Sequence, residues 1–462
     1  MALRKGDLIE LKIDRVAYGG QGVARSNGLV LFVKGAIPGD RVKAQVVKKK
    51  RAYAEAKLTE VLEPSPDRVE APCPYHGHCG GCQWQHVRYE RQLEYKRELI
   101  KEAAARIGSL GDVPVHDVIP SKKQFAYRNK MEFSFSDHRW FLPHEYENRR
   151  GERDFALGLH VPGTFYKVID VEACLLQHET GNRILREVKD YVRKSGIPVY
   201  GLRSHQGFWR FLTLRHSAHF DSWMVNLVTS EEREDWVKPL ADVLCRGFEN
   251  INTVVNNINA KKAAIALGER EIVLAGDGIL RDRIGPFRFQ VSANSFFQPN
   301  ALSAEELYQT VLKYAELKGP EWVLDLYSGT GTIPIFLSEQ ARAIIGMEIA
   351  ESAMLDAQRN CEANNIQNCQ FVLGDIRESL SSLKLKPDVL VIDPPRSGMH
   401  KDVLSKVIEL GTERVIYVSC NPATLARDLG TMQQAYAVLG IQPVDMFPHT
   451  YHVEAIAKLI RR

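Results

Sequence analysis

The stretch Val323–Thr332, VLDLYSGTGT, is typical of a buried strand that runs into a tight glycine turn and then into a helix. Gly329 and Gly331 let the backbone of the turn approach a ligand closely. Asp325 falls at the carboxyl end of the strand, where open α/β sheets bind ligands. The spacing Asp-x-x-x-Gly-x-Gly is not the Gly-x-Gly-x-x-Gly of a dinucleotide site, so it favours a nucleoside with an amino-acid tail over a pyrophosphate.

Three later apolar runs each deliver an acidic residue to the same predicted rim of the sheet. The first ends in Glu348, about twenty residues after the glycine turn, where doubly wound folds bind ribose hydroxyls. The second leads to Asp375 and the third to Asp393. Ligand contact is the favoured interpretation for Glu348 and Asp393, whereas a helix N-cap explains Asp375 nearly as well. The runs are Ile344–Glu348, Phe371–Leu373 and Val389–Ile392.

Length and composition bound the class of protein. A chain of 462 residues suggests about three domains. It has no apolar run that could cross a bilayer, and it begins with charges where a signal peptide would be apolar, so we expect a cytoplasmic protein. Its 8 cysteines are then expected to be thiols, metal ligands or catalytic groups before disulfides.

The net charge of +4 is unevenly distributed. Residues 1–60 hold 13 Lys and Arg against 6 Asp and Glu, a net charge of +7, which leaves a net charge of −3 for the rest of the chain. This excess of positive charge indicates a polyanionic partner for the N-terminal part. Short strand patterns and glycine turns there predict a small OB-like β-barrel, similar to the TRAM domain of RNA-modifying enzymes. The basic run Lys48–Arg51 and Tyr53 favour RNA contact over a solvated face. We expect this domain at residues 1–62, a mixed α+β central domain at 63–295 and an α/β domain at 296–462.

Three cysteines in CPYHGHCGGC are close enough in sequence to surround one metal centre: Cys73, Cys79 and Cys82. Cys174, in VEACLLQH, is the best candidate for a fourth ligand. Structural zinc remains an alternative because histidines stand nearby. The spacing differs from the Cys-x-x-x-Cys-x-x-Cys of radical enzymes, which counts against a radical mechanism. The histidines are His76, His78 and His86.

Three more side chains fall near the predicted ligand rim. Gln298, in SFFQPN, follows a strand and offers an amide to a nucleobase or a cofactor, with a capping role as the alternative. Cys420 ends the predicted core strand Val415–Val418, and a thiol at that rim is better interpreted as a nucleophile than as inert packing. Glu454 begins the last strand, where it can act as a base, with an edge-strand surface charge as the alternative.

Together these motifs resemble the RNA (uracil-5-)-methyltransferase family, most closely the bacterial 23S rRNA enzymes that carry a TRAM domain and an iron–sulfur cluster. The resemblance covers nearly the whole chain and rests on LDLYSGTGT, DPPRSGM, SCNPATLARD, HVEAIAKL, SFFQPN and the cysteine set. It implies a Rossmann-like methyltransferase domain that uses S-adenosylmethionine. The implied donor-binding residues are Gln298, Tyr327, Glu348 and Asp393, with Thr332 and Asp375 as additions; the implied catalytic residues are Cys420 and Glu454; the implied ligands of a 4Fe-4S cluster are Cys73, Cys79, Cys82 and Cys174.

The implied chemistry follows from the poor nucleophilicity of carbon 5 of uracil. The Cys420 thiolate adds to carbon 6, the resulting enolate attacks the sulfonium methyl, Glu454 removes the proton of carbon 5, and the thiolate leaves. Gln298 and Asp393 are candidates for stabilising charge on the enolate oxygen. Because carbon 6 is hidden in a base stack, the uridine must be single-stranded or flipped out. We expect 23S rRNA as the substrate, with a tRNA T-loop uridine as the alternative, and a monomer without a membrane partner.

Two other functions compete with this interpretation. An enzyme that methylates the amino group of adenine or guanine needs an aromatic residue after Asp-Pro-Pro and no thiol, but here Arg396 follows the prolines and Cys420 is present. A noncatalytic RNA-binding or assembly factor on a methyltransferase fold would not need both Cys420 and Glu454.

Overall fold

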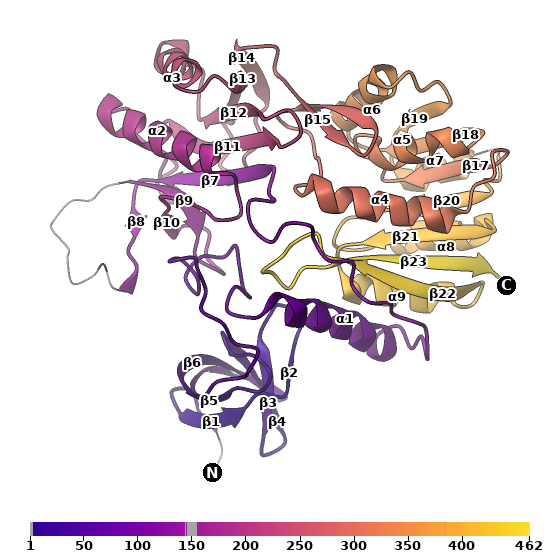
Figure 1. The fold of residues 1–462 in the computed structure, drawn as a ribbon, viewed down its shortest axis with the longest axis horizontal. Coiled ribbons are helices and arrows are strands. Elements are labelled where there is room, and N and C mark those ends of the chain that lie inside the picture. Colours follow the sequence, from indigo (N-terminus) through magenta and orange to yellow (C-terminus); the bar gives the residue numbers. More distant parts are fainter. Residues whose placement is uncertain (1–2, 144, 146–154, 384) are drawn as a thin grey trace.

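The computed structural model describes residues 3–143, 145, 155–383 and 385–462. The described strands form a six-stranded, an eight-stranded and a seven-stranded sheet, and a separate two-stranded hairpin. Figure 1 shows the N-terminal sheet below, the central sheet and the C-terminal sheet side by side above it, and helix α1 (Tyr89–Arg106) between the first and the last. No helix among these residues has the length and apolar character needed to span a membrane.

The N-terminal sheet has the strand order β1-β5-β6-β4-β3-β2. Alternate residues of its strands are buried, and Leu31, Val33, Val42 and Ala44 are among those that fill its core. The small all-β domain expected at this end of the chain is confirmed. The strands are β1 (Leu8–Lys12), β2 (Arg15–Val16), β3 (Gly22–Ser26), β4 (Leu29–Lys34), β5 (Arg41–Lys49) and β6 (Tyr53–Glu63).

The central sheet is mixed and has the order β14-β13-β12-β11-β7-β9-β10-β8. Every residue of the interior strands β11 and β12 is buried, and helices α2 (Glu179–Ser195) and α3 (Glu234–Gly247) share a core with these strands. The expected α+β character is therefore confirmed. The strands are β7 (Lys130–Ser136), β8 (Arg139–Trp140), β9 (Ala156–His160), β10 (Val168–Asp170), β11 (Trp209–Ser217), β12 (Ser222–Thr229), β13 (Ile251–Ile258) and β14 (Arg270–Ala275).

A hairpin connects the central sheet to the C-terminal one. It consists of β15 (Ile279–Ile284) and β16 (Phe287–Ser292), and its backbone is held to helix α6 (Glu351–Ala363) by a hydrogen bond from Gln290 N to Asn360 Oδ1 of 2.7 Å. The segment that follows the hairpin leads to Asn300, which caps helix α4 (Ala301–Ala315) by accepting a hydrogen bond from Ser303 N.

The C-terminal sheet has the order β19-β18-β17-β20-β21-β23-β22. The five strands from β19 to β21 are parallel, and β23 and β22 form an antiparallel hairpin at one end. The strand order reverses at β17, with β18 on one side and β20 on the other, and such a switch point opens a crevice for ligands. The strands are β17 (Trp322–Leu326), β18 (Ala343–Glu348), β19 (Cys369–Leu373), β20 (Val389–Ile392), β21 (Arg414–Ser419), β22 (Tyr436–Val444) and β23 (Glu454–Arg461).

Helices cover both faces of this sheet, so its strands are apolar on both sides. One face packs on α4, α5 (Thr332–Leu337) and the β15–β16 hairpin, and the other packs on α1, α7 (Ile376–Ser382), α8 (Lys401–Leu410) and α9 (Pro422–Met432). A short helix η2 (Ser338–Gln340) follows α5. The Rossmann-like fold expected for this part of the chain is confirmed.

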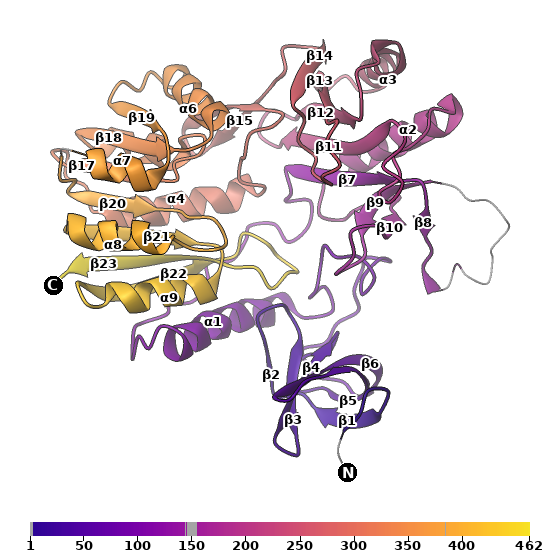
Figure 2. The same cartoon turned by 180° about the vertical axis from the view of Figure 1, so that it is seen from behind.

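Helix α1 comes from the N-terminal half of the chain but packs on the C-terminal sheet, and both Figure 1 and Figure 2 show it beside α9. The segment after it continues along the sheet edge. His116 N donates to Ile441 O at 3.0 Å and Ile119 N donates to Pro443 O at 3.0 Å, so residues 114–119 extend the sheet next to β22. The N-terminal half thereby helps to build the edge of the sheet from which the last loop departs.

Candidate active site

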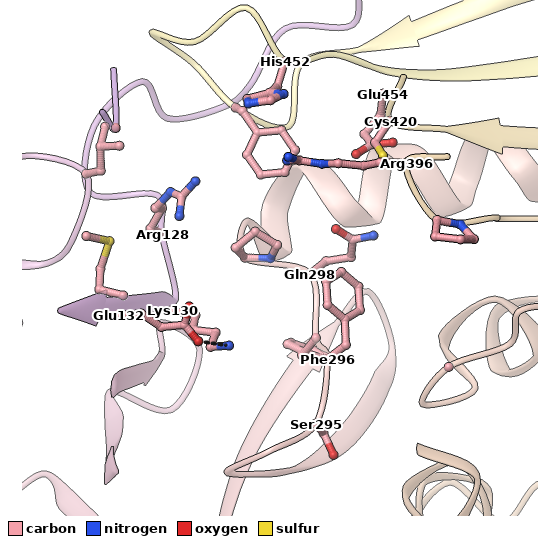
Figure 3. Close-up of a pocket in the computed structure, with 18 of the residues that line it drawn as sticks. Arg128, Lys130, Glu132, Ser295, Phe296, Gln298, Arg396, Cys420, His452 and Glu454 are labelled. Carbon is pink, nitrogen blue, oxygen red and sulfur yellow. Dashed lines mark ion pairs between the residues drawn. The ribbon is translucent and has the colours of Figure 1, made fainter. Parts of the chain in front are cut away.

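A cavity of ≈1020 Å³ lies between the C-terminal sheet and the central sheet. The glycine turn and the ends of β18, β20 and β21 line it from one direction, and β7 and the Cys73–Cys82 loop line it from the other. Figure 3 shows Cys420, Glu454 and Arg396 grouped on one side of this space and Arg128, Lys130 and Glu132 on the opposite side. We call this space the cavity.

The glycine turn has the close-approach geometry that its sequence predicts. Tyr327, Gly329 and Gly331 all have positive φ, of 66°, 53° and 75°. A Cβ atom on Gly331 would lie 2.9 Å from the Cβ of Ala357, whereas one on Gly329 would meet nothing within 4 Å. The backbone at Gly329 therefore borders open space, and Gly331 is required for packing.

Glu348 closes this turn from the neighbouring strand. Its Oε2 accepts a hydrogen bond from Gly329 N at 2.9 Å, and its Oε1 accepts from Ile349 N and Ala350 N at 2.9 and 2.8 Å. The carboxylate is thus oriented by three backbone amides at the end of β18, and it remains part of the lining of the cavity.

Two further acids lie at the same rim. Asp325 is 1% exposed, and neither of its carboxylate oxygens has a hydrogen-bond partner among the described residues. Burial raises its pKa well above the usual value, and the charges of Asp393 and Glu348 add to this. Burial likewise raises the pKa of Asp393 to about 6. Asp325, Asp393 and Glu348 form no ion pair with a cationic side chain of the described residues, and three neighbouring carboxyl groups of this kind favour a positively charged ligand.

Asp375 lies at a smaller cavity of ≈310 Å³ next to the first. It caps helix α7, accepting from Arg377 N at 2.8 Å, and it forms an ion pair with the Arg377 side chain at 2.5 Å. Its hydrogen bonds to Arg377 lower its pKa to about 2. The N-cap interpretation of Asp375 is therefore correct, and the residue also borders a space whose lining includes Tyr327, Glu348 and the 68% exposed Ile349.

Cys420 and Glu454 meet across two antiparallel strands. Ser419 of β21 pairs with Ala455 of β23, so the next step along the ladder brings Cys420 opposite Glu454. Both line the cavity, and Figure 3 shows their side chains together. The structure thus brings the predicted thiol and acid to one point, although they come from different segments.

The same environment sets the protonation of this pair. Burial raises the pKa of Glu454 to about 8, with the charge of Asp393 adding and Arg396 opposing. Burial raises the pKa of the Cys420 thiol to about 11; Glu454 and Asp393 add to the shift, and Arg396 again opposes it. At pH 7 without ligands both groups therefore carry their protons, and bound positive charge would favour releasing them.

The loop of residues 445–453, which leads into Glu454, is held by helix α1. Lys96 and Asp445 form an ion pair of 2.5 Å whose two side chains are 0% exposed, and Lys96 Nζ also donates to Phe447 O at 3.0 Å. Tyr89 donates to Asp445 at 2.9 Å. Gln92 Oε1 accepts from His449 N at 2.8 Å. Because these hydrogen bonds and the ion pair are buried, they hold the loop in place and so fix the backbone position of Glu454, which follows it.

Gln298 and Thr332 also line the cavity. The backbone around Gln298 is held by Asn129, whose side chain donates to Gln298 O at 2.9 Å and whose N–H donates to Pro299 O at 2.8 Å. Thr332 begins α5 and accepts a hydrogen bond from Tyr308 at 3.0 Å. Both predicted residues are therefore at the cavity in fixed positions.

The four cysteines predicted as metal ligands line the same cavity: Cys73, Cys79, Cys82 and Cys174. All are free thiols. Burial raises the pKa of Cys79 to about 11 and that of Cys82 to about 12, and each is raised further by the charges of the other cysteines of the set. Among the described residues, no three His, Cys, Asp or Glu side chains converge closely enough to hold a single metal ion.

Comparison with known proteins identifies the chain. Residues 254–462 match the profile of the tRNA (Uracil-5-)-methyltransferase family, and residues 3–59 match that of the TRAM domain. An RNA methyltransferase of Chlorobaculum tepidum is 41% identical over 466 residues, which is 98% of this chain and 96% of the relative. One of Halalkalibacterium halodurans is 37% identical, with 99% of this chain and 98% of the relative covered.

The chain belongs to the RNA (uracil-5-)-methyltransferase family.

A solved structure supports the same assignment for the fold of this RNA methyltransferase. The tRNA (uracil-54, C5)-methyltransferase of Pyrococcus abyssi, in complex with S-adenosyl-L-homocysteine, superposes with a TM-score of 0.76 at 28% identity, covering 98% of this chain and 100% of that one. The fold is therefore that of an S-adenosylmethionine-dependent methyltransferase with an N-terminal TRAM domain.

Our sequence interpretation of this methyltransferase missed several residues at the cavity. His452 lines it, and burial lowers its pKa to about 4, so its ring is neutral at pH 7. Its position two residues before Glu454 in an extended segment is a signal that could have revealed it. Lys96, which lies outside the cavity, could not have been found this way, because only the folded chain brings it to the loop of residues 445–453.

Proposed function

We propose that the protein methylates carbon 5 of a uridine in RNA by way of a covalent bond between Cys420 and carbon 6. The observation that carries this proposal is the pairing of a thiol and an acid at one end of the β21–β23 ladder, inside a cavity that also contains the glycine turn. A thiol nucleophile and a base at that position are what carbon 5 methylation of a pyrimidine requires.

The S-adenosylmethionine donor fits the rim of the C-terminal sheet. Gly329 leaves open space beside the backbone, and the Asp325 carboxyl, which has no hydrogen-bond partner among the described residues, lies near Asp393 and Glu348 and suits a ligand with positive charge. We assign Glu348, Tyr327, Thr332, Gln298 and Asp393 to the larger part of the donor, and Asp375 to the adjoining smaller cavity. When bound, the donor supplies an electrophilic methyl group.

The residues then act in sequence. Cys420, as its thiolate, forms a bond to carbon 6, and the electrons released onto the uracil carbonyl are stabilised by hydrogen bonds from Gln298 and Asp393. Burial raises the pKa of Asp393 to about 6, so this carboxyl takes up a proton more readily than an ordinary aspartate when negative charge develops beside it. Carbon 5 takes the methyl group, Glu454 accepts the proton of carbon 5, and the bond between Cys420 and carbon 6 breaks to restore the ring.

The reaction predicts that the hydrogen on carbon 5 is lost with each methyl transferred. With RNA that carries tritium on carbon 5 of uridine, we expect the full-length protein and S-adenosylmethionine to release about one tritium per methyl incorporated. An enzyme acting on the amino group of adenine or guanine would transfer methyl groups without tritium release, and a noncatalytic RNA-binding protein would do neither. Either result would contradict the proposal.

We favour 23S rRNA as the substrate, with a tRNA T-loop uridine as the second candidate. The TRAM domain at residues 3–59 and the cysteine set support the first, and the similarity to a tRNA (uracil-54, C5)-methyltransferase favours the second. The two substrates can be distinguished with 23S rRNA and tRNA isolated from cells that lack this enzyme. Each RNA is incubated with the protein and S-adenosylmethionine, and 5-methyluridine is then mapped in the product.

We further propose that the four cysteines at the cavity hold a 4Fe-4S cluster. Their thiols are free and line the same cavity, and four cysteine thiolates are the usual ligands of such a cluster. The cluster ligands would then stand at the wall of the cavity opposite the catalytic pair.

Metal analysis tests this proposal without reference to activity. We expect protein purified without air to be brown and to contain about four iron and four sulfide per chain, because four thiolates are the usual ligands of this cluster. Cys82→Ala should lower the iron content strongly, whereas Cys245→Ala, on α3 and outside the cavity, should not. Stoichiometric zinc without iron would overturn the assignment.

A further inference from the structure

A row of aromatic rings runs from the N-terminal barrel into the cavity. Tyr18, in the β2–β3 turn, contacts Tyr451 edge to face, with ring centroids 5.1 Å apart. Tyr451 contacts His452 at 4.2 Å, and His452 contacts Phe447 at 6.1 Å. At the far end the guanidinium of Arg128 lies 5.9 Å from the centre of the Phe447 ring. We call Tyr18, Tyr451, His452 and Phe447 the aromatic row.

The outer end of the aromatic row is exposed but firmly placed. Gly20 O accepts a hydrogen bond from Trp84 Nε1 at 3.2 Å, which ties the β2–β3 turn to the cysteine loop. Gly20 has φ of 80°, and a Cβ atom there would lie 3.3 Å from the Tyr451 ring. The ring of Tyr18 is nevertheless 41% exposed. An exposed aromatic ring on a fixed turn is available to a partner without an ordering cost for the turn.

The inner end of the aromatic row belongs to the catalytic cavity. His452 and Phe447 line it together with Cys420, and Arg128 does so too. Figure 3 shows His452 above the cavity between Arg128 and the Cys420–Glu454 pair. The row therefore leads from the surface of the barrel to the reacting position, over two segments that are far apart in the sequence.

We propose that the aromatic row is a stacking surface for the unpaired nucleotides next to the target uridine, with Tyr18 of the barrel as its outermost platform. This inference rests on the proposed function, because it requires a flipped uridine beside Cys420. Exposed aromatic rings bind single-stranded RNA by stacking on its bases, whatever the base. Arg396 and Arg128, at the two sides of the cavity, are the cations that the intervening phosphates would meet.

The alternative is that Tyr18 serves only to dock the barrel on the last loop. Its contact with Tyr451 would then stabilise the protein and leave RNA affinity unaffected. The two roles differ in what the exposed part of the ring does, and fluorescence of a base analogue reports that directly.

The test uses the full-length protein and a short single-stranded RNA with one uridine flanked by 2-aminopurine, whose fluorescence falls when it stacks. We expect wild-type protein to quench the fluorescence on binding. Tyr18→Ala should lose most of the quenching and raise the Kd for the RNA roughly ten-fold. Tyr18→Phe should behave as wild type, since it keeps the ring.

The matched control is Phe220→Ala, which removes another exposed aromatic ring, 47% exposed, from a turn outside the cavity. It should leave quenching and Kd unchanged. The melting temperature and the Kd for S-adenosylmethionine are measured for each variant. Tyr18→Ala should lower the melting temperature only slightly and leave the Kd for S-adenosylmethionine unchanged.

Two results would contradict the proposal that the aromatic row is a stacking surface. One is quenching and affinity in Tyr18→Ala equal to wild type, and the other is an equal loss in Tyr18→Phe. Failure of the proposed function is a separate result: wild-type protein would still quench the analogue but would release no tritium from carbon 5 of uridine.

Discussion

Cys420→Ala is expected to abolish covalent capture of RNA that contains 5-fluorouridine. In the wild type the fluorine on carbon 5 cannot leave as a proton, so the adduct formed after methyl transfer is trapped and the protein migrates more slowly in a denaturing gel. Without the thiol no bond to carbon 6 forms, and turnover on ordinary RNA should fall on the order of 10⁴-fold or more.

Matched variants separate this effect from damage to the fold. Cys420 is only half-buried, so its replacement by Ala should leave the melting temperature almost unchanged. Cys245→Ala removes another half-buried thiol, on α3, and should retain full capture. An adduct that persists in Cys420→Ala would refute the assignment of the nucleophile.

Glu454→Gln is expected to separate methyl transfer from product release. Glutamine keeps the size of the side chain but cannot accept the proton of carbon 5, so ordinary RNA should remain bound to Cys420 as a methylated adduct. General bases contribute about 10²–10⁴-fold, and we expect turnover to fall within that range. Release of product at the wild-type rate would show that another group is the base.

The pH dependence of the wild type gives an independent check on Glu454. Burial raises the pKa of this carboxyl to about 8. A base works only after losing its proton, so the rate at which the methylated adduct is resolved to product should rise with pH until about pH 8 rather than level off near pH 5. In Glu454→Gln this rise of the rate with pH should disappear.

Glu454→Gln should also change the pKa of the Cys420 thiol. Burial is the main cause of the raised pKa of Cys420, but the charge of Glu454 adds to it. Removing that charge should therefore lower the thiol pKa, and alkylation of Cys420 by iodoacetamide should begin at lower pH. An unchanged alkylation profile would indicate that the two groups do not interact.

Local patterns made most of the C-terminal domain predictable. The strand and turn at Val323–Thr332, and the later apolar runs that end in acids, are each short segments whose apolar spacing is visible without neighbours. Because parallel strands of such a sheet end at one rim, residues at the ends of different strands could be predicted to meet. The positions of Glu348, Asp393 and Cys420 around the cavity agree with that rule.

Other features depend on contacts between distant segments. The charged, apolar-spaced run Tyr89–Arg106 is typical of a helix, but nothing in it indicates that Lys96 is buried against Asp445 and holds the loop before Glu454. A lysine on a charged helix is usually solvated, so nothing local distinguishes this one. The approach of Tyr18 to Tyr451 is equally invisible, because it depends on how the barrel docks on the finished C-terminal domain.

By itself the amino-acid sequence determined the Rossmann-like sheet, the N-terminal β domain and the chemical types of residue at the rim, since strand periodicity, glycine turns and strand ends are properties of short segments. Only the tertiary structure decided that Cys420 faces Glu454 and that the cysteine set shares their cavity. It also decided that helix α1 and the β2–β3 turn both contact the loop of residues 445–453. The physical reason is that these contacts join surfaces from different layers, and their geometry exists only after each layer has buried its own apolar face.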